Sequence, residues 1–361
     1  MKENKISVVQ VIDQLNAGGA ERVLVNWANI LHEKGQQSAV ITTVDAGILA
    51  KALQENIEFF DLRRKWKWNP FAMYRLVKIL KNYDVIHVHS SHNLRYVWLA
   101  SKLFRLKKKI FFHEHFYFEK ISWHRRAIYP KTKMICVSNF VRDWAIKNNL
   151  STEKNVFLLP NIIVPHLIDI APEKRQKDIV KIVITGNIAP RKNIEFALEI
   201  FNVLKKQLFE NYNLTIIGSV TDKKYYTYLQ NKITIYGLEK QVQFIHDCDN
   251  IQPILNQFDL ALHPSKFETG PLVLIEYLAK SLPFLSSNTG EVPAQIDEEL
   301  PGFVIKTNEP ETWAAAIQEI ISTDKKILDK KMKTIFEKYY SIDQYYDKGM
   351  SIYAKGLEKE I

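Results

Sequence analysis

Short apolar segments alternate with amphipathic helical segments along almost the whole chain of 361 residues. Residues 6–13 (ISVVQVID) are typical of a buried strand, and helical periodicity follows from Ala20 through Leu31. Further strand-like runs occupy residues 38–44, 85–90, 108–115, 133–138 and 155–161. Strands that alternate with helices predict a doubly wound parallel sheet, so the fold class is α/β.

The alternation of strand and helix signals is interrupted once along the chain. Residues 162–179 contain two prolines and a run of charges, which predicts a linker. Apolar strands resume at residues 180–186, 213–219, 242–245 and 260–265. A single hydrophobic core seldom grows beyond about 250–300 residues, so we expect two domains. Their predicted bounds are 1–165 and 179–340, with a linker at 166–178 and a terminal segment at 341–361.

The segment HPSKFETGPLVLIEYLAKSLP, residues 263–283, combines two carboxylates with a helix start. Gly270 and Pro271 open an apolar helical run, where proline at a first helical position loses no hydrogen bond. The free amides around residues 269–273 and the helix dipole favour a phosphate. Glu276 lies five residues inside the helix, about 7.5 Å along its axis from the start. That is about the offset from the diphosphate to the ribose of a nucleotide, whose hydroxyls a carboxylate can accept. Glu268 stays in the loop and would face the group that the diphosphate carries.

This segment predicts a nucleotide-sugar site, although two Glu at this spacing also occur by chance. A strand leads into it and a second strand with a glycine loop follows, which places it at a carboxyl edge of the sheet. The predicted donor-binding residues here are Gly270, Pro271, Leu272, Val273 and Glu276.

Two further loops contain residues suited to an anion. Gly18 and Gly19 join the first strand to the first helix and would let a ligand approach the backbone; a tight turn is the alternative. No third glycine follows, which argues against a dinucleotide-dependent oxidoreductase. Lys192, in TGNIAPRKN, could place an ammonium on phosphates beside Arg191; a solvated basic turn is the alternative.

In order along the chain, these motifs resemble those of the retaining glycosyltransferases of family 4, which have the GT-B fold. Glu268, Glu276, Pro264-Ser265 and the Gly290 loop match the Glu-x7-Glu signature, whereas Thr269 stands where the family has Gly. The resemblance implies two Rossmann-like doubly wound parallel-sheet domains that face a central cleft. It also implies that residues 341–361 form a helix that crosses back onto the first domain.

The resemblance also implies roles for individual residues. Glu268, His115 and Lys192 would be catalytic, with Glu268 and His115 on the donor sugar and Lys192 on the leaving diphosphate. Asn187 stands where the family has Arg, so one phosphate cation is missing unless Arg191 replaces it. The other implied residues are Gly186 and Gly218 in the donor site and Gly18, Gly19 and Ser138 on the acceptor side of the cleft. No residue is placed as a nucleophile, which favours front-face attack, and no metal or other cofactor is obligatory.

Two patterns could suggest a metal site. His113, Glu114 and His115 end one strand, but no third ligand appears in register, so we expect no metal there. His87 and His89 are expected to be structural. The Asp-x-Asp at residues 247–249 is interpreted as coincidence.

The charge of +10 is concentrated in the first half, with 26 Lys and Arg against 13 Asp and Glu through residue 166. Basic and aromatic residues interleave at Arg63–Tyr83 and Phe104–Phe112. Such a mixture on a helix suits an anionic membrane surface. A plain solvated face and a nucleic acid are the alternatives, but no nucleic-acid motif accompanies the charge. We expect a cytoplasmic protein on the inner face of the membrane.

Together these features predict a retaining glycosyltransferase that takes a nucleotide-diphosphate sugar, most simply a UDP-sugar. The predicted acceptor is a lipid-linked or cell-surface glycan such as lipopolysaccharide, capsule or teichoic acid. Two alternatives stay open: a UDP-sugar 2-epimerase on the same fold, and a non-catalytic GT-B binding protein.

Overall fold

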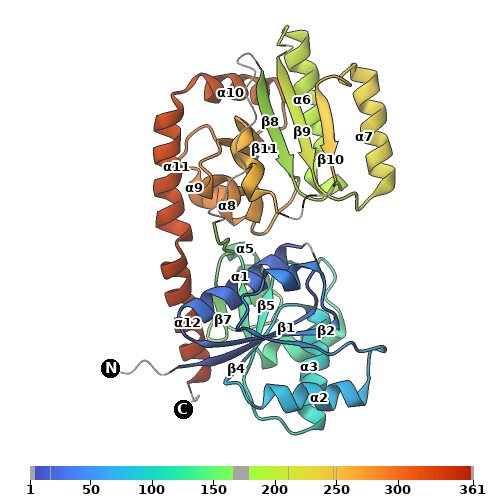
Figure 1. The fold of residues 1–361 in the computed structure, drawn as a ribbon, viewed down its shortest axis with the longest axis vertical. Helices are drawn as coiled ribbons and strands as arrows, with labels where there is room; N and C mark the ends of the chain where they lie inside the picture. The colour runs from blue at the N-terminus through green and yellow to red at the C-terminus, as the bar shows by residue number, and fades with distance from the viewer. Residues whose placement is uncertain are drawn as a thin grey trace. The chain divides into compact units, whose positions relative to one another are not determined.

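The computed structural model describes residues 5–16, 18–165, 179–209, 211–246, 248 and 250–358. The chain divides into two units (Figure 1). Unit 1 contains Met1–Ile163 and Ile342–Ile361, and unit 2 contains Val164–Ser341. The predicted linker at 166–178 and the two Asp of the Asp-x-Asp pattern, Asp247 and Asp249, lie outside the described residues.

Unit 1 is built on a seven-stranded parallel sheet of order β3-β2-β1-β4-β5-β6-β7. Its strands are β1 (Ser7–Gln14), β2 (Gln37–Asp45), β3 (Glu58–Asp61), β4 (Val85–Val88), β5 (Ile110–Glu114), β6 (Lys133–Cys136) and β7 (Val156–Leu158). The sequence predicted all of these except β3. That edge strand has no buried residue, so it lacks the apolar run on which the prediction rested.

Helices cover both faces of this sheet. They are α1 (Gly19–Glu33), α2 (Pro70–Leu80), α3 (Ser91–Leu103), α4 (Trp123–Ile128), α5 (Asn139–Lys147) and α12 (Ile342–Leu357), with short 3-10 turns η1 (Ile48–Ala52) and η2 (Tyr129–Lys131). On one face, Leu24 and Ala28 of α1 pack against Ile12 and Val40. On the other face, buried residues of α2, α3, α4 and α5 form the larger core.

The C-terminal helix α12 packs against α1 within unit 1. The Trp27 indole N–H donates to the Tyr353 hydroxyl at 2.7 Å. Glycine is required where α12 touches α1 and β5: a Cβ on Gly349 would lie 2.6 Å from the Trp27 ring of α1, and one on Gly356 would lie 2.4 Å from the Phe111 ring of β5. The last helix of the chain therefore belongs to the core of the first unit.

Unit 2 is built on a six-stranded parallel sheet of order β10-β9-β8-β11-β12-β13. Its strands are β8 (Val180–Thr185), β9 (Tyr212–Ile217), β10 (Val242–Ile245), β11 (Leu260–His263), β12 (Phe284–Ser287) and β13 (Val304–Ile305). Its helices are α6 (Ile194–Lys206), α7 (Lys223–Tyr236), α8 (Leu272–Ala279), α9 (Glu291–Ile296), α10 (Pro310–Ser322) and α11 (Lys325–Tyr340), with η3 (Pro190–Lys192) and η4 (Gln252–Gln257). Both units therefore have the expected doubly wound architecture.

The strand order fixes where a ligand can approach each sheet. In unit 1 the chain reverses its direction of winding between β1 and β4, and in unit 2 between β8 and β11. Loops diverge at such a switch point and leave a crevice at the carboxyl ends of the strands, where open α/β sheets bind ligands. The predicted site loops follow these strands: Gly18 follows β1, Gly186 follows β8, and Glu268 follows β11.

The two basic stretches match the expected amphipathic helices only in part, since α2 (Pro70–Leu80) accounts for about half of the first one. In Arg63–Tyr83, the side chains of Trp66 and Trp68 are exposed but lie in the loop before α2. In Phe104–Phe112, the two final phenylalanines belong to β5 and are fully buried, so they cannot reach a membrane. Within the described part of the chain, no helix is long and apolar enough to cross a bilayer.

Candidate functional site

The loop after β8 delivers Lys192 to the switch point of unit 2. η3 turns the chain back so that Lys192, its last residue, is buried although it carries a charge. Gly186 leaves room for this side chain, because a Cβ there would stand 3.1 Å from Lys192 Cε. Gly218 allows a second close approach, since its Cβ would lie 2.0 Å from the Gly186 carbonyl oxygen. The two predicted glycines thus create the space that the lysine fills.

The Lys192 ammonium forms an ion pair with Glu268, at 2.6 Å from Nζ to Oε1. Both side chains are about one-tenth exposed, at 10% and 9%. Burial alone would raise the pKa of Glu268, but the charge of Lys192, with His263 and Arg191, holds that pKa below its usual value. Glu268 is therefore a carboxylate at neutral pH, and the structure brings together two of the three predicted catalytic residues.

A loop after β12 holds the Glu268 segment in place. The Glu268 amide donates to Thr289 Oγ1 at 3.0 Å, and the Glu291 amide donates to the Thr269 carbonyl at 2.9 Å. Gly290 has a φ of +90°, and a Cβ there would stand 2.9 Å from Pro271 Cδ. The predicted Gly290 loop therefore positions the carboxylate by contact, a role that the sequence did not assign to Thr289.

Helix α8 begins one residue later than the sequence predicted. Pro271 is the N-cap, in extended geometry with ψ of 104°, rather than the first helical residue. Leu272 and Val273 are the first two residues of the helix, and amides in this first turn have no acceptor within it. Glu276 is the fifth residue of α8 and is only 3% exposed. The predicted phosphate seat and the predicted ribose carboxylate thus belong to one helix.

His263 is a further residue at this site that the sequence left without a role. It ends β11, and its Nε2 lies 3.9 Å from Glu268 Oε1. Burial, with the nearby Lys192, lowers the pKa of His263 to about 3, so the ring is neutral. Its place at the carboxyl end of the switch-point strand was the available signal.

Asn187 and Arg191, the two positions considered for a second phosphate cation, differ in burial. Asn187 is half-buried in the loop after β8, whereas Arg191 is exposed. The charge of Arg191 nevertheless contributes to the lowered pKa of Glu268. Arg191 is therefore close enough to act electrostatically, but from a solvated position.

The predicted acceptor-side residues of unit 1 lie at helix starts. Gly18 is the N-cap of α1 and Gly19 is its first residue; a Cβ on Gly18 would collide with Glu21 Oε2 at 2.2 Å. Ser138 is buried and caps α5, accepting from the Val141 amide at 3.2 Å. The Ser138 hydroxyl thus has a structural partner in addition to any ligand.

Four buried histidines form what we call the imidazole cluster: His87, His89, His113 and His115. Their rings stack along each stretch of chain, with centroids 4.3 Å apart for His87–His89 and for His113–His115, and across β4 and β5, at 5.2 Å for His87–His113 and 5.6 Å for His89–His115. Burial lowers the pKa of all four and brings the pKa values of His87 and His115 to about 3. The predicted catalytic residue His115 is therefore a neutral ring within unit 1.

Hydrogen bonds fix the ends of this cluster. The Tyr353 hydroxyl accepts from the Trp27 indole and forms a second hydrogen bond with His87 Nδ1 at 2.7 Å. At the other end, His89 Nε2 lies 2.9 Å from Gln10 Oε1, and His89 Nδ1 lies 3.3 Å from His115 Nε2.

The expectation that no third metal ligand stands in register is wrong, because His87 in β4 and His89 directly after β4 lie beside His113 of β5. One nitrogen each of His87, His89 and His113 lies within 4.8 Å of the others. The planes of His87 and His113, however, are only 16° apart, and those of His87 and His89 only 29°. A metal binds in the plane of an imidazole ring, so stacked rings direct their lone pairs side by side rather than toward one point. The geometry fits a packed core better than a metal site.

Glu114, between two of these histidines, is a second buried acid that the sequence left without a role. Burial raises the pKa of Glu114 to about 7, against partial compensation from Tyr129 and the Phe116 amide. The Glu114 carboxyl, at the end of β5, therefore changes its charge near neutral pH.

Two protein-family models match the chain in succession. The model described as Glycosyltransferase Family 4 matches residues 17–166, and the one described as Glycosyl transferases group 1 matches residues 168–338. Together they span nearly the whole chain, one on each predicted domain. The chain belongs to the GT-B glycosyltransferases.

Curated relatives agree with this family. The glycosyltransferase is 24% identical over 343 residues to the capsular polysaccharide biosynthesis glycosyltransferase CapH of Staphylococcus aureus, covering 89% of this chain and 92% of that one. It is also 24% identical over 386 residues to an Escherichia coli UDP-Gal:α-D-GlcNAc-diphosphoundecaprenol α-1,3-galactosyltransferase. That match covers 97% of this chain and 96% of the E. coli one. Among its relatives are thus glycosyltransferases of cell-surface polysaccharide synthesis.

A solved structure shows the same fold. The glycosyltransferase aligns with Anabaena HepE in complex with UDP and glucose, at a TM-score of 0.80 and 17% identity, covering 97% of this chain and 99% of that one. At that identity the likeness establishes the GT-B fold.

Proposed function

We propose that this glycosyltransferase retains the anomeric configuration and transfers a sugar from a UDP-sugar to a lipid-linked or cell-surface glycan. Lipopolysaccharide, capsule and teichoic acid are acceptors of this class. Unit 2 binds the donor, unit 1 binds the acceptor, and no metal is obligatory. The protein works in the cytoplasm, on the inner face of the membrane.

The observation that carries the proposal is the buried Lys192–Glu268 pair at the switch point of unit 2. The Glu268 carboxylate neutralises the Lys192 ammonium, which makes a buried cation tolerable at this position. A diphosphate that enters beside the first turn of α8 offers the ammonium a second, more highly charged partner. Glu268 is then released to accept hydroxyl hydrogen bonds from the donor sugar. Glu276, further along α8, binds the ribose.

The role proposed for Glu268 favours front-face attack over a covalent intermediate. A carboxylate that accepts hydrogen bonds from the hydroxyls of the donor sugar is held by them and is not directed at the anomeric carbon. Stabilisation of the leaving diphosphate by Lys192 and the α8 amides is then the main contribution to catalysis, as expected where charge develops on a departing group. The acceptor hydroxyl attacks on the side that the diphosphate leaves.

The relatives support the choice of substrates. The E. coli relative is named for UDP-Gal and a diphosphoundecaprenol-linked sugar, and the HepE structure contains UDP. Exposed aromatic side chains beside basic ones in Arg63–Tyr83, such as Trp66 at 60% exposure, support contact with an anionic membrane.

A thermal-shift screen of UDP, GDP, ADP and their sugars tests the proposal. We expect UDP and UDP-sugars to raise the melting temperature, and chelation of metal ions to leave that shift unchanged. A protein that none of these nucleotides stabilises would not be a nucleotide-sugar enzyme. Glu276→Ala should reduce the UDP shift; a full shift in that variant would contradict only the ribose assignment.

Turnover without an acceptor separates the remaining alternatives. Slow hydrolysis of the donor that is lost in Glu268→Ala would distinguish an enzyme from a binding protein. Conversion of a UDP-N-acetyl sugar to its 2-epimer in the same incubation would instead identify an epimerase. The anomeric configuration of the transferred sugar, determined by NMR, tests retention.

A further inference from the structure

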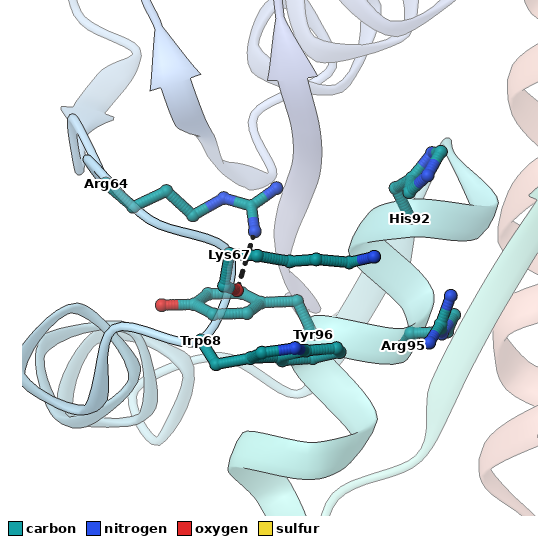
Figure 2. Close-up of a pocket in the computed structure, with 6 residues that line it drawn as sticks. All are labelled: Arg64, Lys67, Trp68, His92, Arg95 and Tyr96. Carbon is teal, nitrogen blue, oxygen red and sulfur yellow. Dashed lines mark hydrogen bonds between the residues drawn. The ribbon is translucent and has the colours of Figure 1, made fainter.

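A second pocket lies at the carboxyl edge of the unit 1 sheet. It is lined by Arg64, Lys67, Trp68, His92, Arg95 and Tyr96 (Figure 2). The first three belong to the loop between β3 and α2, and the other three to the start of α3, which follows β4. Because β4 is one of the two switch-point strands of unit 1, the pocket stands where this fold class places its ligands.

Arg64 is committed to holding the pocket together. Its Nε donates to Thr43 Oγ1 at 3.2 Å, one Nη donates to the Lys67 carbonyl at 3.1 Å, and the other to Asp13 Oδ1 at 3.3 Å. Its guanidinium also lies 4.6 Å from the centre of the Tyr96 ring. The bond to Lys67, drawn in Figure 2, fixes the loop against the ends of β1 and β2. Arg64 is therefore neutralised by the protein itself.

Lys67 and Arg95 have no such neutralising partner. Among the described residues neither forms an ion pair with a carboxylate. Both instead lie over the Trp68 indole, with the Lys67 ammonium at 5.5 Å and the Arg95 guanidinium at 5.6 Å from a ring centroid. Figure 2 shows Lys67, His92 and Arg95 together on one side of the pocket. A lysine, an arginine and an imidazole thus line this pocket together, and none of the described residues that line it is acidic.

The effect of this concentration of charge extends to a neighbouring residue. The pKa of His124 is lowered, first by burial and then by the charges of Arg95, Arg125, His92 and Lys67. The field at the pocket is therefore positive enough to disfavour a further proton. An anion there would relieve the repulsion among these side chains.

Exposed aromatic side chains occur in the loop that contains Lys67 and in two helices of the same unit. Trp66, Phe71 and Tyr74, on the same loop and on α2, are 60%, 78% and 59% exposed. Trp123, at the start of α4, is 78% exposed. Large aromatic groups at this exposure are typical of surfaces that enter the headgroup region of a bilayer. A ligand that is anionic at one end and lipidic at the other matches the combination.

We propose that this pocket binds the phosphate group of a lipid, in the first place the diphosphate that links an isoprenoid carrier to the acceptor sugar. Lys67 and Arg95 contact the phosphate oxygens, His92 donates a further hydrogen bond, and the exposed aromatic side chains contact the lipid chain. The assignment rests on the proposed function, since it specifies the class of acceptor that unit 1 takes. A phospholipid headgroup offers the same phosphate chemistry and is the competing source.

Titration calorimetry with farnesyl diphosphate tests this proposal, with UDP present at saturation so that the donor site is filled. We expect wild type to bind farnesyl diphosphate, and farnesol to produce no measurable heat. Lys67→Gln combined with Arg95→Gln should weaken the affinity by about tenfold or more, because charge-assisted hydrogen bonds to phosphate are lost.

A matched pair of lysines provides the control. Lys102 and Lys131 lie over another tryptophan, Trp98, at 5.8 and 5.2 Å, in a basic pocket at the opposite end of α3. Lys102→Gln combined with Lys131→Gln removes the same charge and should change the affinity by less than about twofold, as expected for a general surface field. Equal losses in the two double variants, or no loss in the first, would overturn the proposal.

Vesicles of phosphatidylcholine with and without phosphatidylglycerol distinguish the two sources of phosphate. If the carrier diphosphate is the ligand, both double variants lose vesicle binding equally while only the Lys67/Arg95 variant loses farnesyl diphosphate. A selective loss of phosphatidylglycerol binding in that variant would assign the pocket to the headgroup. The UDP thermal shift stays intact in every variant if the proposed function holds. Its absence from wild type would contradict that function, whereas the farnesyl diphosphate titration would still test the pocket.

Discussion

The switch points of the two units have the same topology, but the buried polar side chains are charged in unit 2 and neutral in unit 1. In unit 2 an ammonium and a carboxylate face each other at 2.6 Å. In unit 1 four imidazoles stack as neutral rings, and the charged groups, Lys67 and Arg95, stand in the loops nearby. The sheet therefore determines where each site lies, and the loop residues determine its chemistry.

The buried groups of the two units also differ in whether a ligand can replace one of their partners. An ion pair can exchange its carboxylate for a phosphate, because the buried cation stays neutralised and hydroxyl donors of the ligand can satisfy the released carboxylate. Neutral stacked rings offer no such exchange, so the unit 1 core acts as a rigid support and its ligand contacts come from the periphery. Separate substitutions in each unit test this contrast.

The largest expected effect is that of Lys192→Ala on turnover. Removing the only buried ammonium among the described residues of this site should lower kcat for UDP-sugar hydrolysis by about 100- to 1,000-fold, as for loss of one preorganised group that stabilises developing charge. UDP release assays measure it. The control is Lys266→Ala, which removes an exposed lysine paired with Glu195 at 2.7 Å in the same region. A Lys192 variant no slower than the control would mean that the pair is structural.

Tyr353→Phe tests the hydrogen bonds that hold the imidazole cluster of unit 1. It deprives two buried groups, the Trp27 indole N–H and His87 Nδ1, of their shared partner. An unpaired buried polar group costs about 1–3 kcal/mol, so we expect a loss of stability in that range, confined to unit 1. Urea unfolding, with hydrogen exchange of α12 and of β8 as reporters, localises the loss. Tyr346→Phe, which removes a half-buried bond from Gln36, should cost less.

Acid should destabilise unit 1 more steeply than unit 2 below pH 6.5, because the four buried histidines of the imidazole cluster lie in unit 1, whereas His263 alone contributes in the same way at the unit 2 site. The pKa values of His87 and His115 fall from 6.5 to about 3 on folding, so between those values the unfolded chain binds protons that the folded one does not. Their contribution is lost as the pH falls below 6.5, by about 1.4 kcal/mol per pH unit for each ring. Glu114, whose pKa is raised to about 7, has the opposite effect between pH 7 and 4.5, where its stabilising contribution grows as the pH falls and offsets the loss from one histidine. Glu268, whose pKa is lowered, loses its contribution only below 4.5.

His113→Phe sharpens this contrast, because the ring stacks on its neighbours and its pKa is also well below 6.5. We expect the variant to reduce the dependence of unit 1 stability on pH by about 1.4 kcal/mol per unit between pH 6 and 5. Hydrogen exchange of β5 amides across that range measures the slope. An unchanged slope would show that His113 is already protonated in the folded protein.

The fold was predictable because apolar strands and amphipathic helices have distinct periods. Only short edge strands such as β3 and β13 escaped, since their pairing depends on neighbours far along the chain. The Glu268 loop and Lys192 were predictable as separate motifs. Their ion pair was not, because 76 residues separate them. The imidazole cluster required the register of β4 with β5, and the lipid-phosphate pocket required the loop of Arg64 beside α3.

The smallest expected effect concerns the missing cation at Asn187. Arg191 acts on Glu268 from an exposed position, where screening limits a charge to about 0–1 kcal/mol. Arg191→Ala should therefore lower turnover by less than about fivefold, far less than Lys192→Ala. Asn187→Arg places a guanidinium directly after Gly186, in a half-buried position where screening is weaker. If Arg191 only partly replaces the absent arginine, this variant should tighten UDP binding and make Arg191 dispensable. Thermal shifts with UDP for the single and double variants decide it. Additive effects would mean that the two positions act on different parts of the diphosphate.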